Sequence, residues 1–237
     1  MANSVRALSK LERAACLPVP LDKKFFNPKA VIPYCCTVDH IHAAMTEFQD
    51  FLGFVNVSLR KRKFTRLETI LMPANFSSVV GEFIASGLPK HCPTLARNTY
   101  HNGHPDLIPK GKFKKDAVQY GDEGIEIKAS RYSKSWQGHN PEAIWLMIFV
   151  FDCNRPSDVV RGIPPKPFRF LMVAGAQLSK ADWLFAGRSE KSRRTITASV
   201  IKTGYEKIMR NWIYRAPDLP ADPHHLETTL HSQDQDD

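Results

Sequence analysis

The chain has 237 residues, which is enough for one sizeable domain with its own core, or for a domain with a small appendage. Its 43% hydrophobic and 24% charged residues are typical of a globular protein and exclude a largely disordered chain. The formal charge is +9, and residues 216–237, with six acids and no lysine or arginine, contribute −6, which leaves +15 on residues 1–215. A segment with this positive charge favours a polyanionic partner, most commonly nucleic acid. The alternative is a basic protein that has no polyanionic partner.

Three sequence features bear on location. The longest apolar run, residues 143–151, is far too short to cross a bilayer. The basic residues Arg6, Lys10 and Arg13 are not followed by the apolar stretch of a secretory signal. Five cysteines without framework spacing fit a reducing compartment. We therefore expect a cytoplasmic protein with no membrane partner.

The first part of the chain has apolar residues at helical spacing. Residues 4–16 predict a short helix, and the proline-rich residues 17–33 predict a connector. Residues 40–51 predict a second helix, which Gly53 ends. Residues 54–59 then have the composition of a strand.

A run of basic side chains follows that segment. It consists of Arg60, Lys61, Arg62, Lys63 and, slightly later, Arg66. In a DNA-binding protein such a run contacts backbone phosphates, whereas elsewhere it forms a solvated loop. The sequence leaves both interpretations open.

The middle of the chain predicts a helix, a strand and a long hairpin. Residues 76–88 form the helix, which carries Glu82, and residues 95–100 form the first core strand. Glycines on both sides of the hairpin loop allow the chain to turn back. Lys112 and Lys114 lie in that loop, where a nucleic-acid backbone would pass.

The returning segment alternates apolar and charged residues, as a half-buried strand does. Ile125 and Ile127 would enter the core, while Glu126 and Lys128 share the opposite face. Asp106 reaches the same place if it lies at the end of the neighbouring strand. The pattern therefore gathers two acids and a lysine.

These residue types suggest a metal-dependent phosphodiester hydrolase. Mg2+ prefers oxygen ligands and is commonly held by one or two carboxylates, with water and substrate phosphate completing its shell. Asp106 and Glu126 supply the carboxylates, and the backbone carbonyl of Ile127 is a candidate third ligand. Lys128 would lie near the attacking water or the scissile phosphate and balance developing charge.

Pro105-Asp106 followed by Glu126-x-Lys128 resembles the PD-(D/E)XK nuclease superfamily, the fold of most type II restriction endonucleases. The resemblance covers roughly residues 75–175. It implies an αβββαβ core within the α+β class, with a mixed central sheet flanked by helices. It also implies hydrolytic DNA cleavage that depends on Mg2+, for which Mn2+ can substitute. Such families often add an acid from the helix before the first core strand, and Glu82 occupies that place.

Each of these residues also has a purely structural interpretation. Asp106 follows a proline and is a common turn residue. Glu126 and Lys128 could form an ordinary charged face on a solvated hairpin. Glu82 could be a solvated helix residue.

The C-terminal third follows a connector, residues 154–167 with a short helix at 157–161, and a buried strand at 168–174. Residues 178–215 predict a DNA-recognition region and a last helix at 205–213, whereas residues 216–237 predict a disordered tail. Arginine pairs with guanine in the major groove, and hydroxyls serve bases or phosphates. The candidate DNA contacts are Arg188, Ser189, Lys191, Arg193, Arg194, Thr195 and Thr197. The alternative is a basic surface turn.

Histidines and cysteines raise the alternative of a zinc site. The candidates are Cys35, Cys36, His40, His42, His91, Cys92, His101 and His104. There is no CxxC pair, and none of the usual ligand spacings is present, so the sequence does not predict structural zinc. His101 and His104 are expected in loops near the active site.

The sequence thus predicts a single nuclease domain over residues 1–215, with an N-terminal helical extension over residues 1–70. Its function would be that of a sequence-specific, Mg2+-dependent double-stranded DNA endonuclease of the restriction type. The resemblance implies a homodimer and a cognate methyltransferase that protects host DNA. Two alternatives stay open, namely a structure-specific repair or recombination nuclease of the same fold, and a non-catalytic DNA-binding protein.

Overall fold

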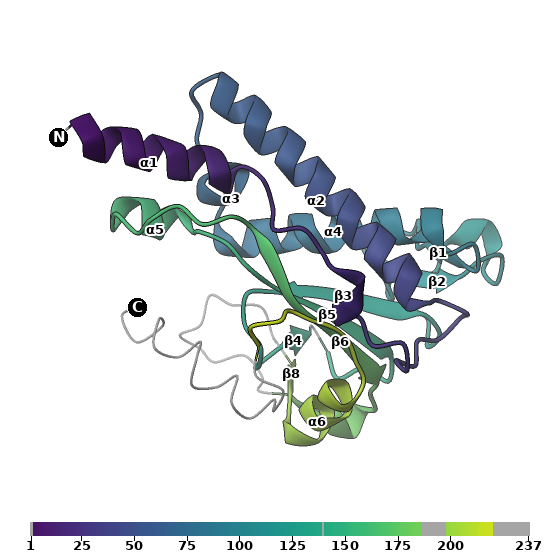
Figure 1. Cartoon of the computed structure of the whole chain (residues 1–237). Coiled ribbons are helices and arrows are strands. Elements are labelled where there is room, and N and C mark those ends of the chain that lie inside the picture. Colours follow the sequence, from purple (N-terminus) through teal and green to yellow (C-terminus); the bar gives the residue numbers. More distant parts are fainter. Residues whose placement is uncertain (1, 139, 186–197, 220–237) are drawn as a thin grey trace, which may run out of the picture.

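A mixed six-stranded β-sheet runs through the middle of the protein (Figure 1). The structure is a computed structural model and describes residues 2–138, 140–185 and 198–219. The strands, in spatial order, are β1 (Leu95–Arg97), β2 (Leu107–Pro109), β3 (Ile125–Ser130), β5 (Trp145–Asp152), β6 (Arg169–Gln177) and β9 (Trp212–Arg215). Neighbouring strands are antiparallel, except that β3 and β5 are parallel. The protein is therefore of the α+β class, as predicted.

Helices and a small second sheet surround the central sheet. The α-helices are α1 (Ala2–Ala15), α2 (Val38–Lys61), α3 (Leu67–Ile70), α4 (Pro73–His91), α5 (Pro156–Val160) and α6 (Lys202–Arg210). The 3-10 turns within the described residues are η1 (Lys23–Phe25), η2 (Lys114–Asp116) and η3 (Lys180–Asp182). The second sheet has the order β4 (Gln137–Gly138), β8 (Ala198–Val200) and β7 (Trp183–Phe185). Among the described residues, no helix is long and apolar enough to cross a membrane.

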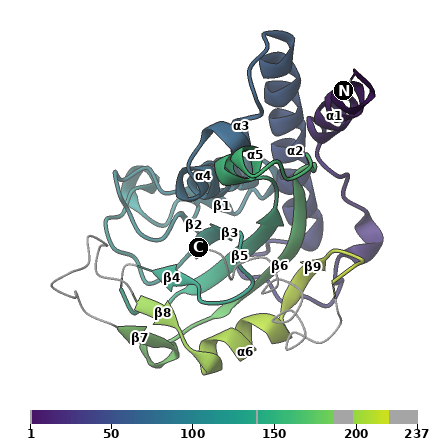
Figure 2. The same ribbon diagram turned by 90° about the vertical axis from the view of Figure 1, so that its left-hand side faces the viewer.

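The elements form layers on both faces of the central sheet (Figure 2). Helices α2 to α5 lie on one side, and α6 lies with β7 and β8 on the other. The side chains of β5 alternate between two apolar clusters: Met147, Phe149 and Phe151 face the α2 and α4 side, and Leu146, Ile148 and Val150 face the α6 side. Each fully buried Phe contributes roughly 1.5–3 kcal/mol. A strand that is covered on both faces has a continuous apolar sequence, and this pattern allows it to be predicted.

Helix α2 differs from the sequence-based expectation. The predicted end at Gly53 and the predicted strand over residues 54–59 are both wrong, because α2 continues to Lys61. A Cβ on Gly53 would lie 3.3 Å from Pro18 Cδ, so the glycine gives close packing against the connector instead of ending the helix. Asn56, one turn later, is buried and bonds to Glu68 and to the backbone of Leu67. Tertiary contacts thus override the local strand propensity.

The connection between β3 and β5 also differs from an αβββαβ order. Its described residues contain no helix, and β4 from this segment pairs with β8. The last helix begins and ends three residues before its predicted bounds, and its C-terminal neighbour is the unpredicted edge strand β9. The first residues of the predicted disordered tail, 216–219, pack against the protein, since Ala216 is buried and Asp218 pairs with Arg169 at 2.5 Å. Residues 220–237 of that tail lie outside the described residues.

Candidate active site

The residue immediately before β2, Asp106, lies beside β3. Leu107 pairs with Ile125 in antiparallel register, so Asp106 lies just before the paired segment. The backbone N–H of Ile127 donates to Asp106 Oδ2 at 2.8 Å. The C=O and N–H of one strand residue point to the same edge, so the Ile127 carbonyl faces the same side as this carboxylate. Gly124 permits the close approach, because its φ is +143° and a Cβ would lie 2.1 Å from the Leu107 carbonyl oxygen.

Strand β3 has the predicted alternation. Ile125 and Ile127 belong to the core on the helix side. Glu126 is on the opposite face, yet only 8% of its surface is exposed, which differs from a solvated charged face. Lys128 Nζ donates to Glu126 Oε1 at 2.9 Å, and His104 Nδ1 lies 3.1 Å from Glu126 Oε2. Both carboxylate oxygens of this buried glutamate are therefore engaged by basic groups.

One pocket of about 730 Å³ contains the predicted catalytic residues. Its walls come from α4, the end of β1, the hairpin loop and β3. The polar side chains and backbone that line it include Glu82, Arg97, Asn98, Tyr100, His104, Asp106, Tyr120, Glu126, Ile127, Lys128, Asn140 and Glu142. The structure thus brings together the acids and the lysine that the sequence pattern singled out.

Glu82 lies at the more exposed side of this pocket. Its carboxylate accepts a hydrogen bond from Arg97, which also donates to Ser86 of α4. Its side chain is 63% exposed, in contrast to buried Glu126. Glu82 is thus near the proposed metal ligands but is engaged in a surface ion pair.

The charges in the pocket shift one another's pKa values. Burial, reinforced by the neighbouring charge of Glu126, raises the pKa of Asp106. Burial also opposes ionisation of Glu126, but hydrogen bonds and charge from His104 and Lys128 outweigh it and lower the pKa of this glutamate. The pKa of Lys128 is raised despite burial, because Glu126 stabilises the ammonium form. Glu126 and Lys128 therefore form an ion pair at neutral pH, and an additional cation would favour ionised Asp106.

His104 and Glu142 add to the predicted set. His104 was expected only as a loop residue near the site, and Glu142 was not predicted. The ligand atoms of His104, Glu126 and Glu142 lie within 4.8 Å of one another, which makes them a possible cation-binding group. Burial opposes protonation of His104, but Glu126 and Glu142 raise its pKa. Glu142 precedes β5, which is parallel to β3, and that pairing was not evident from sequence.

The predicted DNA contacts have different environments. Those within residues 186–197, from Arg188 to Thr197, lie outside the described residues. Lys112 pairs with Glu123, and Lys114 is exposed in η2. Arg60 donates to the carbonyl and hydroxyl oxygens of Ser9, which ties α2 to α1.

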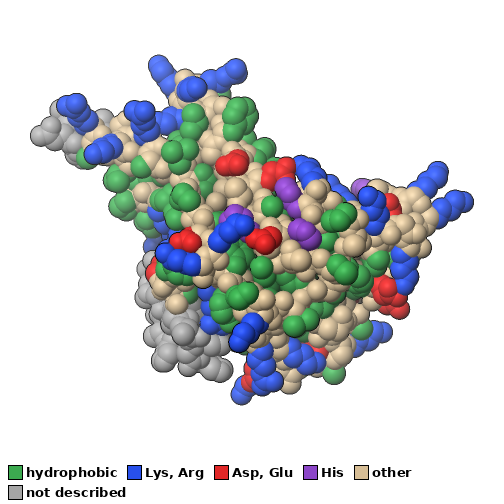
Figure 3. All heavy atoms as spheres, turned by 45° about the vertical axis from the view of Figure 1, so that its right-hand side comes forward, with side chains coloured by type: hydrophobic (Ala, Val, Ile, Leu, Met, Phe, Trp, Pro, Cys, Tyr) green, Lys and Arg blue, Asp and Glu red, His purple; other side chains and the backbone are tan. Residues whose placement is uncertain are grey.

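The remaining basic run is divided between surface and interior. Lys61 and Arg62 are exposed, whereas Arg66 is only 2% exposed and its guanidinium bonds to protein groups. The interpretation of Arg66 as a phosphate contact is therefore wrong. Lys and Arg side chains gather at the end formed by α1 and the C-terminus of α2, and again at the opposite end around β1 and β2 (Figure 3).

Comparisons with known proteins do not assign this site. No protein-family model matches the chain, and no curated protein sequence matches it significantly. The candidate function therefore depends on the geometry and chemistry of the residues themselves.

Proposed function

We propose that this protein is a Mg2+-dependent endonuclease that hydrolyses phosphodiester bonds of double-stranded DNA at specific sequences. The observation that carries the proposal is the convergence of Asp106, Glu126 and Lys128 in one pocket, at the junction of β2 and β3. This pattern and its location on adjacent strands resemble a PD-(D/E)XK nuclease site.

The donor set fits a hard divalent cation. Asp106 and Glu126 offer carboxylate oxygens, and the Ile127 carbonyl faces the same strand edge as Asp106. Such oxygen ligands suit Mg2+. Burial and the neighbouring charge of Glu126 raise the pKa of Asp106, and a bound cation would favour its ionised form. When bound, Mg2+ would make water more acidic and stabilise charge on the phosphate.

The protein side chains have distinct proposed roles. Lys128 holds its proton, so its ammonium group can balance the negative charge that develops on the scissile phosphate. His104 contacts the second carboxylate oxygen of Glu126 and acts as a positioning residue. Glu82, through its contact with Arg97, would stabilise the α4 wall and contribute negative charge near Asp106.

The order of elements supports the same comparison. Helix α4 is followed by β1, β2 and β3, and β5 then joins the sheet parallel to β3. This order resembles the αβββ part of a restriction-endonuclease-like core with its parallel fourth strand. The described connection before β5 lacks the helix of that core, so the proposal depends primarily on the site.

The positive charge of the chain supports DNA as the substrate. Residues 1–215 have a formal charge of +15, as calculated from the chain and its acidic C-terminal segment. Lysines of the hairpin loop, including Lys112 and Lys114, are near the pocket-bearing strands in the sequence and would contact backbone phosphates. Cleavage of both strands would use two copies of the chain on a two-fold symmetric site, and light scattering with cognate DNA tests this homodimer.

The first experiment is incubation of the full chain with unmethylated phage-length DNA, in Mg2+ and in EDTA, followed by gel electrophoresis. Discrete fragments only with Mg2+ support sequence-specific cleavage. A smear favours a non-specific or structure-selective nuclease, which a branched substrate then tests. Intact DNA with a salt-sensitive mobility shift would contradict catalysis and support a DNA-binding protein.

A further inference from the structure

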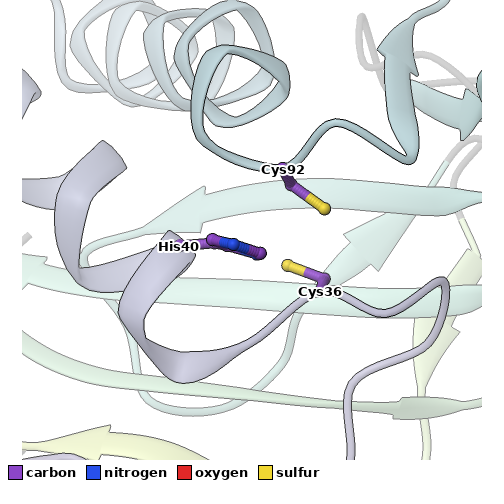
Figure 4. A group of neighbouring side chains, drawn as sticks. All are labelled: Cys36, His40 and Cys92. Atoms are coloured by element: carbon purple, nitrogen blue, oxygen red, sulfur yellow. The ribbon is translucent and has the colours of Figure 1, made fainter.

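Three potential metal ligands converge outside the lining of the candidate active site (Figure 4). Cys36 precedes α2, His40 is in the first turn of α2, and Cys92 is the C-cap of α4. One ligand atom from each lies within 4.8 Å of the others. Cys36 is 5% exposed and Cys92 is fully buried, while His40 is partly exposed.

The sequence did not predict this group because its members do not form a familiar motif. Cys36 and His40 are four residues apart, on either side of the α2 N-cap, and Cys92 joins them only through the packing of α4 near α2. Linear spacing shows none of the usual zinc-ligand patterns. The structure adds the missing spatial relation.

The backbone before α2 directs adjacent cysteines to different environments. Tyr34 and Cys35 have positive φ values of 59° and 56°, a conformation that non-glycine residues rarely adopt in succession. After this turn Cys35 is exposed and Cys36 is buried beside Cys92. Thr94 donates to the Tyr34 carbonyl, and its hydroxyl oxygen lies 3.2 Å from Cys92 Sγ. One threonine therefore connects the turn to the second cysteine.

We propose that Cys36, His40 and Cys92 bind a soft or borderline divalent cation such as Zn2+, which links the N-terminus of α2 to the C-terminus of α4. Two thiolates and one imidazole suit Zn2+ and disfavour Mg2+. Water completes a tetrahedral shell. Each cysteine releases its thiol proton to solvent on binding, and no oxidation takes place.

Metal binding by His40 would change the hydrogen bonds at the N-cap of α2. Its Nδ1 accepts a hydrogen bond from the Thr37 backbone N–H at 3.2 Å, while Thr37 Oγ1 accepts from the His40 N–H at 3.3 Å. A cation at Nδ1 uses the accepting lone pair, and a cation at Nε2 leaves the ring proton on Nδ1. In either case the first bond is lost, whereas the second can persist. Water can replace the lost bond because this cap is exposed.

Co2+ is the probe for the first test. The purified full chain is treated with chelator and reductant, the chelator is removed, and the protein is titrated with Co2+ and then with Zn2+. We expect a thiolate-to-cobalt charge-transfer band at one equivalent, which Zn2+ removes. Zn2+ should also shift the Thr37 amide resonance and raise the thermal midpoint, since a ligand that binds only the folded state stabilises it.

Variants test the identity of the ligands. Cys36→Ser and Cys92→Ser should abolish the band, and His40→Ala should weaken Co2+ binding by at least about tenfold, an effect at least as large as that of a lost outer-shell contact. Cys35→Ser is the matched control because the adjacent thiol is exposed, and it should retain the band. Circular dichroism verifies folding, and His40→Ala keeps the test informative if a buried cysteine variant unfolds.

Three outcomes would overturn the metal proposal. The first is the absence of a charge-transfer band in the fully reduced wild-type protein. The second is an equal band in folded Cys36→Ser or Cys92→Ser. The third is two fewer free thiols in denaturant before reduction, combined with no Co2+ uptake after it, which would indicate a Cys36–Cys92 disulfide. Because the readout is specific for sulfur ligands, Asp106→Asn should leave it unchanged whether or not the proposed nuclease function is correct.

Discussion

Replacement of Arg66 by alanine should strongly destabilise the fold. The Arg66 guanidinium donates to Glu68 Oε1 at 2.6 Å, Asn154 Oδ1 at 2.8 Å and the Lys166 carbonyl at 3.0 Å. It also pairs with Glu12 of α1. The side chains of Arg66 and Glu68 are 2% and 0% exposed, respectively. Truncation would therefore leave the Glu68 carboxylate buried without its arginine partner, while Asn56 still donates to Glu68 Oε2.

The expected loss in unfolding free energy is about 3–5 kcal/mol, the range for removal of one partner from a buried ion pair. The double variant Arg66→Met/Glu68→Gln should recover part of this loss, because it also removes the uncompensated carboxylate. Arg62→Ala is the matched control from the same basic run. Arg62 is exposed, so its replacement should change stability by less than about 0.5 kcal/mol.

Urea unfolding followed by circular dichroism measures these differences from the transition midpoint at an unchanged slope. A loss below about 1 kcal/mol for Arg66→Ala would refute the structural role, because it is far below the range for a broken buried pair. If Arg66→Ala weakened DNA binding without a change in stability, Arg66 would instead be a phosphate contact.

Two further predictions concern stability elsewhere. Although burial opposes it, hydrogen bonds from Lys207, Ser179 and Thr203 lower the pKa of Asp182 to about 2. Asp182→Asn should therefore cost about 2–3 kcal/mol at pH 7 by linkage to an unfolded pKa near 3.9. The stabilisation is present above the unfolded pKa and is lost as pH falls towards 2, so urea unfolding should show the wild-type advantage shrinking from pH 4 to pH 2; a constant advantage would contradict it. Gly124→Ala should cost at least about 2 kcal/mol, because positive-φ strain adds to a clash with the Leu107 carbonyl. Gly111→Ala, with φ of +76° and no atom near the added Cβ, should cost only the strain of about 1 kcal/mol; equal thermal midpoints for the two variants would contradict the clash.

The sequence revealed those parts of the fold for which local pattern and tertiary packing agree. The apolar run at residues 143–151 corresponds closely to β5, which is covered on both faces. Alternation around Ile125 and Ile127 likewise identified β3 and the face that carries Glu126. It could not show that Glu126 is buried, because this depends on neighbouring elements.

The missed features depend on contacts between distant segments. Gly53 and the β-branched residues after it favour a helix end locally, yet packing against Pro18 and the bonds of Asn56 accommodate a continuous α2. Glu142 joins the candidate site only through the position of β5 beside β3. Cys92 similarly approaches Cys36 only when α4 and the start of α2 are brought together. Linear spacing contains none of these relations.

The cysteine and histidine group illustrates the same point for metal sites. Its members are separated in the chain, but their ligand atoms converge in space. The two carboxylates of the proposed nuclease site were easier to predict, because the hairpin brings Asp106, immediately before β2, into one pocket with Glu126 of β3. The proposed nuclease site could therefore be predicted from one hairpin, whereas the cysteine and histidine group is formed only when the helices pack.

The most direct test of the central proposal is single-turnover DNA cleavage by Asp106→Asn, Glu126→Gln and Lys128→Ala, with DNA binding measured in parallel. Asp122→Asn is the matched control, since Asp122 is an exposed acid in the same hairpin loop. We predict Mg2+-dependent cleavage by the wild type and the control, and a loss of at least about 10²-fold in each site variant, the scale expected when a group that stabilises transition-state charge is removed. DNA binding should be retained. Cleavage within tenfold of the wild type in all three folded site variants, or equal cleavage in EDTA, would contradict the proposal.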